Sequence, residues 1–131
     1  MTEPRQALYA YLSAHSSVQA AVGDRIYQRR VPAGATKPLI LVQPPIDRVP
    51  VRDLAGVAYR RSRIQVTAMA DTQPEAEKAA QAVMAAVEGY RGKMAGVLDV
   101  MQVMVDNDRQ VDYVDINEIH HHVDLILKHK G

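Results

Sequence analysis

The 131-residue sequence contains no cysteine, no phenylalanine and no tryptophan. Without cysteine there are no disulfide bonds and no thiolate metal sites, and the composition suits a reducing cytoplasm. Without phenylalanine and tryptophan, the hydrophobic core must be built from Val, Ile, Leu, Met, Ala and Tyr side chains. Aliphatic packing is therefore expected to carry the stability of the fold.

Long apolar runs and targeting signals are also missing. No run approaches the roughly 20 residues of a membrane helix, and the N-terminal MTEPRQALYAYL lacks the apolar region of a secretion signal. A chain of 131 residues with 47% hydrophobic and 24% charged side chains fits one globular domain, which we expect to span residues 1–131.

Motifs of common catalytic sites are absent. The sequence has no G-x-S-x-G, no P-loop, no G-x-G-x-x-G and no H-E-x-x-H. The acids between residues 106 and 115 lack the glycine and the closing glutamate of a calcium-binding loop. We therefore expect neither enzymatic activity nor a cofactor.

Two main helices are predicted. One covers about residues 3–14, with Thr2 as N-cap, and a short helical turn after it ends at Gly23. The second begins at Thr72 with a capping box, in which Glu75 returns to the backbone N–H of Thr72. Alanines and valines at helical spacing follow, and Gly89 ends this helix.

Strands are predicted for most of the remaining chain, over residues 25–31, 39–43, 59–70, 97–105 and 118–129. Ile64 and Val66 alternate with polar residues, as in a half-buried strand. The proline-rich segment 44–58 is expected to be a long loop or an irregular hairpin arm. Element order predicts an α+β fold with a mostly antiparallel or mixed β-sheet and two main helices on one face.

Residues 97–115 are predicted in two parts. Simple alternation over 97–105 places Val100 and Met104 on one face of a strand, and Val103 and Val105 on the other. The acidic stretch that begins at Asp106 is predicted to be a turn region.

Three consecutive histidines, residues 120–122, lie within the last predicted strand. Neighbouring side chains of a strand point to opposite faces, so only His120 and His122 share a side, and Asp124 continues their row. Two histidines and one carboxylate are a ligand set for a divalent ion. The alternative is that these residues are exposed polar positions of a sheet face.

Charge is unevenly distributed, although the net charge is only +1. From Arg25 to Arg63 there are nine basic residues against two acids, and from Asp99 to Asp124 seven acids against Arg109 alone. The two halves either neutralise each other inside one subunit or form opposite edges that meet head to tail between subunits.

The segment GDRIYQRRVPAGATKP contains Arg29 and Arg30. These would form a basic patch with Arg60, Arg61 and Arg63 if their strands paired. Such a patch could bind nucleic acid, but the acids of the second half cancel the surplus charge and no clear stacking platform accompanies it. A protein contact is favoured, with the candidate interaction residues Arg29, Arg30, Arg48, Arg52, Arg61, Arg63, Asp106, Asp108 and Asp112.

The chain resembles a known family over roughly residues 5–128. The matching positions are the run VGDRIY at residues 22–27, Pro32, Pro38, Gln65, Glu75 and Ala76. These are similar to the tail completion or tail terminator proteins of long-tailed bacteriophages and prophages. Two positions depart from the family pattern. Gln28 stands where the family often has proline, and the closing strand HHHVDLILKH stands where the family often has an aromatic strand.

The resemblance implies an architectural role. It implies an α+β protein of the virion tail, assembled in the host cytoplasm as a hexameric ring on the head-proximal end of the tail tube. Its expected partners are other copies of itself, the tail tube protein and the head connector protein, with no membrane and no nucleic acid. Segment 44–58 is then a candidate arm that reaches a neighbour or the tube.

Overall fold

The computed structural model describes residues 4–52 and 58–130. Its helices are α1 (Pro4–Ala14), α2 (Ser16–Val22) and α3 (Gln73–Val87), with a 3-10 turn η1 (Val114–Ile116). Its strands are β1 (Ile26–Gln28), β2 (Leu39–Val42), β3 (Asp47–Arg52), β4 (Ala58–Ala70), β5 (Gly92–Met94), β6 (Leu98–Tyr113) and β7 (Glu118–His129). The predicted α+β class is confirmed.

One mixed sheet contains all these strands. Its order is β1-β2-β4-β7-β6-β5, and β3 pairs with the first half of β4. Strands β1 and β2 are parallel, and the other pairs are antiparallel. The long strands β4, β7 and β6 form the centre, and β7 is hydrogen-bonded on both sides.

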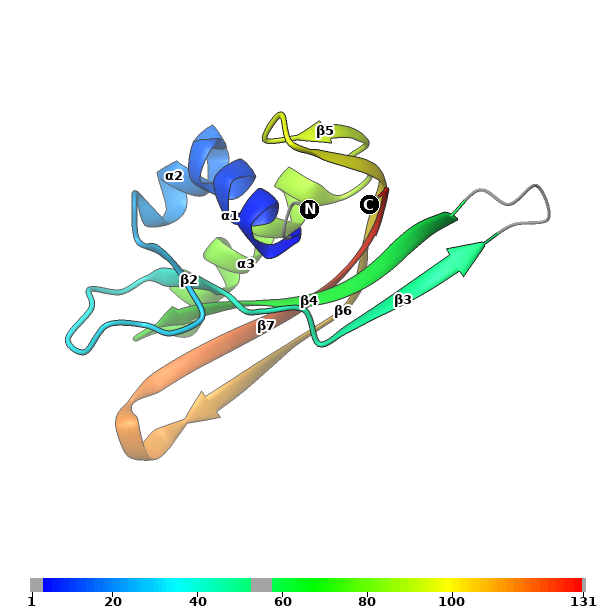
Figure 1. Cartoon of the computed structure of the whole chain (residues 1–131). Coiled ribbons are helices and arrows are strands. Elements are labelled where there is room, and N and C mark those ends of the chain that lie inside the picture. The colour runs from blue at the N-terminus through cyan, green and yellow to red at the C-terminus, as the bar shows by residue number, and fades with distance from the viewer. Residues whose placement is uncertain (1–3, 53–57, 131) are drawn as a thin grey trace.

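The helices cover one face of the sheet, as the sequence predicted (Figure 1). Alternate residues of β4 and β7 point into this layer, among them Ile64, Val66 and Leu125, all at most 1% exposed. Leu8 and Leu12 of α1 and Val83 of α3 face them and are fully buried. The core is aliphatic throughout, as the composition required.

The residues at the helix ends lie close to where the sequence predicted them. The short turn after Ser16 is a true third helix, α2, and Gly23 ends it with a φ of 63°, which glycine adopts without strain. Thr72 is the N-cap of α3 as predicted. The predicted backbone bond of the capping box is not formed: the Thr72 hydroxyl donates to the Glu75 carboxylate at 3.1 Å instead.

The first two strands are shorter than predicted. Strand β1 ends at Gln28 because Arg29 has a φ of 69°, a left-handed conformation that breaks the extended backbone. Two other contacts fix this segment: the Arg25 Nε donates to the Pro38 carbonyl at 2.8 Å, and Ile26 enters the core. The GDRIY run thus ends α2 and begins an edge strand, which the Arg25–Pro38 hydrogen bond and the burial of Ile26 hold in place.

Strand β6 corrects two sequence predictions. Register shifts at Met101 and near Asp106 break the simple alternation, so Val100 and Val103 both reach the core although simple alternation placed them on opposite faces. The predicted acidic turn region is strand as far as Tyr113, because β6 continues to pair with β7 residue by residue. The actual turn is η1, closed by Asn117 with a φ of 53°.

Two hairpins mark opposite ends of the molecule (Figure 1). At one end β3 and β4 form a hairpin arm, which was one of the two alternatives predicted for segment 44–58. Residues 53–57 lie outside the described part. At the other end β6 and β7 meet at η1. A hairpin therefore projects from each end of the helix-covered body.

Candidate assembly interface

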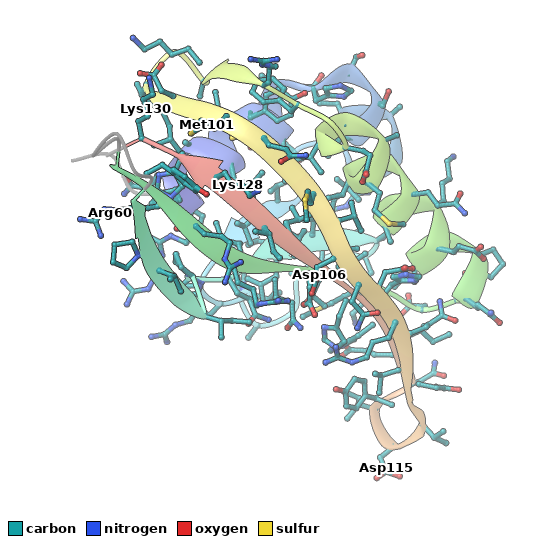
Figure 2. The ribbon with its side chains drawn as sticks, turned by 90° about the vertical axis from the view of Figure 1, so that its right-hand side faces the viewer. Arg60, Met101, Asp106, Asp115, Lys128 and Lys130 are labelled. Atoms are coloured by element: carbon teal, nitrogen blue, oxygen red, sulfur yellow. The ribbon has the colours of Figure 1, made fainter. Side chains whose placement is uncertain are left out.

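The face of the sheet opposite the helices carries a row of polar side chains (Figure 2). Gln43 Nε2 donates to the Thr67 hydroxyl at 3.4 Å, and that hydroxyl lies 2.9 Å from Nδ1 of His122. Beside them Gln65 Nε2 donates to Asp124 Oδ1 at 3.1 Å. This network joins β4 and β7 with Gln43, the residue after β2, and gives a polar sheet surface.

The surroundings of His122 favour its neutral form. Burial lowers the pKa of His122, and the positive charge of Arg109 lowers it further. The hydrogen bond fits this state, since the Thr67 hydroxyl, which accepts from Gln43, can either donate to Nδ1 or accept from it. The imidazole acts as part of the structural network.

The basic and acidic halves of the sequence meet partly inside the chain. Arg63 of β4 and Asp106 of β6 form an ion pair at 2.6 Å that reaches across β7. Arg109 lies 3.9 Å from Asp124. Intramolecular neutralisation, the first of the two alternatives, thus accounts for Arg63 and Asp106, two of the candidate interaction residues.

The turn end of the β6–β7 hairpin is tied to the loop that follows β1. Lys37 Nζ lies 3.4 Å from Glu118 Oε2, and His120 Nε2 lies 3.1 Å from Glu118 Oε1. The His120 hydrogen bond is the main reason why the pKa of Glu118 falls below its usual value. The His120 ring also packs on Tyr113, with centroids 4.4 Å apart.

Asp108 and Asp112 lie on the hairpin strand rather than in a turn. Asp108 Oδ2 lies 2.9 Å from Nε2 of His121, its diagonal neighbour on β7. Asp112 is exposed and forms no ion pair with any described residue. Asp112, unlike Asp108, therefore keeps its charge available to a partner.

The candidate arginines do not gather into the single patch that strand pairing would have made. Arg29 and Arg30 follow β1, which pairs with β2 and not with β4. Arg61 is exposed on β4, opposite Val49 of β3. Of Arg48 and Arg52 only the backbone on β3 is described, and their side chains lie outside the described part.

The histidine row lies as predicted, on one face. The ring centroids of His120 and His122 are 6.0 Å apart, and Asp124 continues the row on β7. The nearest polar partners of these side chains are protein groups: Glu118, Thr67 and Gln65. Among the described residues, no group of three or more His, Cys, Asp or Glu is arranged to hold a metal ion.

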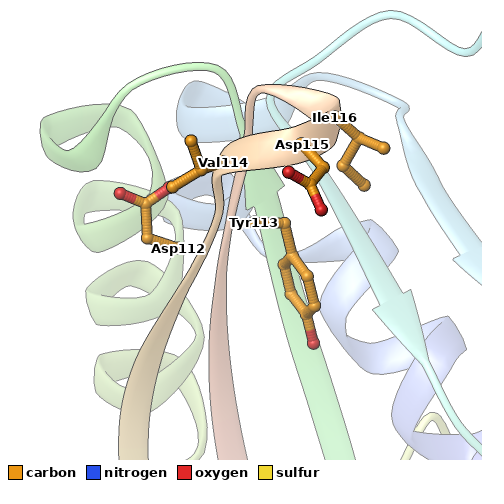
Figure 3. A pocket seen from close by; sticks show the side chains of 5 residues that line it. All are labelled: Asp112, Tyr113, Val114, Asp115 and Ile116. Carbon is orange, nitrogen blue, oxygen red and sulfur yellow. The ribbon is translucent and has the colours of Figure 1, made fainter.

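Sequence reasoning missed the hollow at the end of the β6–β7 hairpin (Figure 3). It measures about 450 Å³ and is lined by Asp112, Tyr113, Val114, Asp115 and Ile116. Val114 is 79% exposed and Ile116 is 59% exposed. Apolar residues inside an acidic turn were visible in the sequence, but only the hairpin geometry shows that they form a projecting tip.

Comparisons with known proteins decide the family. The model of the family described as tail completion protein gp17 matches residues 6–125. The chain belongs to this family. It is a tail completion protein, and this membership confirms the resemblance that the sequence suggested over nearly the same residues.

A solved structure supports the fold of this tail completion protein. A chain in the structure titled "Virion of native gene transfer agent (GTA) particle" superposes with a TM-score of 0.79 at 20% identity. The match covers 98% of this chain and 96% of that chain. A search of curated proteins found no match. No helix among the described residues has both the length and the apolar character needed to cross a membrane.

Proposed function

We propose that this tail completion protein forms a hexameric ring on the head-proximal end of the tail tube, ends tube polymerisation and gives the head connector a docking surface. The observation that carries the proposal is the pair of hairpins at opposite ends of the body (Figure 1). Contact elements at two ends suit a heterologous, head-to-tail contact, which closes into a ring when the rotation permits. The number of six subunits rests on the resemblance to tail terminator proteins.

Virions assembled without this protein test the proposal. Tubes that nothing caps should keep growing, so electron microscopy should show tails of uncontrolled length that are not joined to heads. Supplying the wild-type protein from a plasmid should restore one tail length and head joining. Tails of normal length in its absence would refute a terminating role.

Arg29 and Arg30 are proposed to contact another protein of the tail. Both are exposed, and no hydrogen bond or ion pair joins either side chain to the described residues. Arg29→Glu or Arg30→Glu should therefore leave the unfolding midpoint unchanged, because surface changes of this kind alter stability little.

Assembly should respond strongly to the same two variants. Like charges across an interface cost several kcal/mol, so the yield of complete particles should fall by roughly tenfold or more. Lys78→Glu, at an exposed position of α3, is the matched control and should leave the yield unchanged. Particle counts that equal the wild-type counts would remove these arginines from the interface.

A further inference from the structure

The end of the β6–β7 hairpin is an exposed surface of mixed apolar and acidic character. We call Asp112, Tyr113, Val114, Asp115 and Ile116 the tip surface. No described residue forms an ion pair with Asp112 or Asp115, and both side chains are exposed. Exposed aliphatic residues at the end of a projecting element, rimmed by charge, are typical of an interaction site.

A surface of opposite charge lies at the other end of β6. We call it the basic hollow: it measures about 490 Å³, and its lining includes Arg91, Lys93, Asp99, Met101 and Lys130. Three cationic side chains there face a single carboxylate. Met101 is 40% exposed, and Val97, in the turn that precedes β6, is 54% exposed. The basic hollow thus offers both charge and apolar area.

These two surfaces cannot meet within one chain. Strand β6 separates them, and Figure 2 shows Met101 and Lys130 at one end of the molecule and Asp115 at the other. From Met101 to Asp112 the strand spans roughly 35 Å at about 3.3 Å per residue. Because β6 is held in the sheet over this length, only a second molecule can bring a tip surface to a basic hollow.

We propose that the tip surface of one copy docks on the basic hollow of the next copy. Asp112 and Asp115 then face Lys93 and Lys130, and Val114 packs on the apolar part of the hollow. This contact rests on the proposed ring and names its subunit interface. It uses different patches of the two copies, so a docked pair still has one free basic hollow and one free tip surface, to which further copies can add until the ring closes.

Cross-linking on assembled tails tests the contact directly. The protein has no cysteine, so the double variant Val114→Cys with Met101→Cys carries the only two thiols of the chain. A short bis-maleimide should link neighbouring copies into a ladder of dimers and larger species. Each single variant should give no ladder, and Val114→Cys with Glu77→Cys, on the exposed side of α3, is the control pair.

Charge reversal gives the second test. Asp112→Lys with Asp115→Lys should reduce incorporation into tails by roughly tenfold or more, and so should Lys93→Glu with Lys130→Glu. All four substitutions in one chain should restore much of the incorporation, because the complementarity is only inverted. If the charge-reversed variants failed only because their fold was damaged, combining all four substitutions would not restore incorporation.

Three outcomes overturn the contact. They are no ladder from the double cysteine variant, a link from Val114→Cys to a different tail protein, and normal incorporation of either charge-reversed variant. These results leave the proposed function intact if tails made without the protein still have uncontrolled lengths. Normal tails without the protein would instead refute the terminating role, whatever the cross-links show.

Discussion

Replacing Leu125 by alanine should lower the free energy of unfolding by about 2–5 kcal/mol. Leu125 lies in the middle of β7, is 0% exposed and points to the helix-covered side of the sheet. Truncation removes its transfer free energy and leaves a cavity between β7 and α3, which pack on each other. A domain of this size has a total stability of about 5–15 kcal/mol, so the loss is a large fraction of it.

Urea unfolding of the purified protein, followed by circular dichroism, measures this loss. Val114→Ala removes a similar aliphatic side chain from a site that is 79% exposed, so its unfolding midpoint should not move. An unchanged midpoint for Leu125→Ala would mean that the sheet and helices do not close around this residue. An unchanged slope in both variants would show that the effect is on stability rather than on the unfolded state.

The buried half of the fold could be predicted because each of its elements has one apolar face. In β4, Ile64 and Val66 alternate with polar residues, and in β7 Val123 and Leu125 do the same. Period-two alternation specifies both the strand and the face that meets the helices. Helix α3 was equally clear, because Thr72 caps it and Ala79 and Val83 repeat at helical spacing.

The projecting half could not be predicted in the same way. Residues Asp106 to Arg109 of β6 are exposed, so no hydrophobic alternation marks them as strand. Backbone pairing with β7 holds them extended, and this pairing depends on a partner from elsewhere in the sequence. The register shifts in β6 could not be predicted either, because they depend on how each valine packs in the core and not on the local sequence pattern. Strand β5, three residues long, carries too little pattern to be recognised.

Candidate site residues were identified from charge, but their partners were not. Arg63 reaches Asp106 only because β7 lies between β4 and β6, an order that sequence patterns do not specify. The basic hollow is even less visible, since it unites Arg91 and Lys93 with Lys130 from the end of the described chain. Counting charges therefore revealed their uneven distribution along the sequence. Only the topology shows which charges pair within the chain and which remain exposed at the two ends of the molecule.

Shortening the β6–β7 hairpin should abolish assembly while leaving the fold intact. Asp112 and Ile119 face each other across the hairpin, so residues 113–118 can be replaced by Asn-Gly, which favours a two-residue hairpin turn. This change removes the apolar part of the tip surface, including Val114 and Ile116. It also removes the packing of Tyr113 on His120 and the contacts of Glu118 with His120 and Lys37. The ion pair with Lys37 is partly exposed and is worth roughly 1 kcal/mol or less.

Two measurements separate assembly from folding in this variant. Its unfolding midpoint should stay close to that of the wild type, because 113–117 are exposed and Glu118 is only partly buried. Tails made with it as the only source of the protein should be as uncontrolled in length as tails that lack the protein. Val114→Ser with Ile116→Ser keeps the hairpin length and should give an intermediate defect. Tails of normal length from the shortened variant would show that the tip surface holds no neighbour, and the subunit contact would have to lie elsewhere on the sheet.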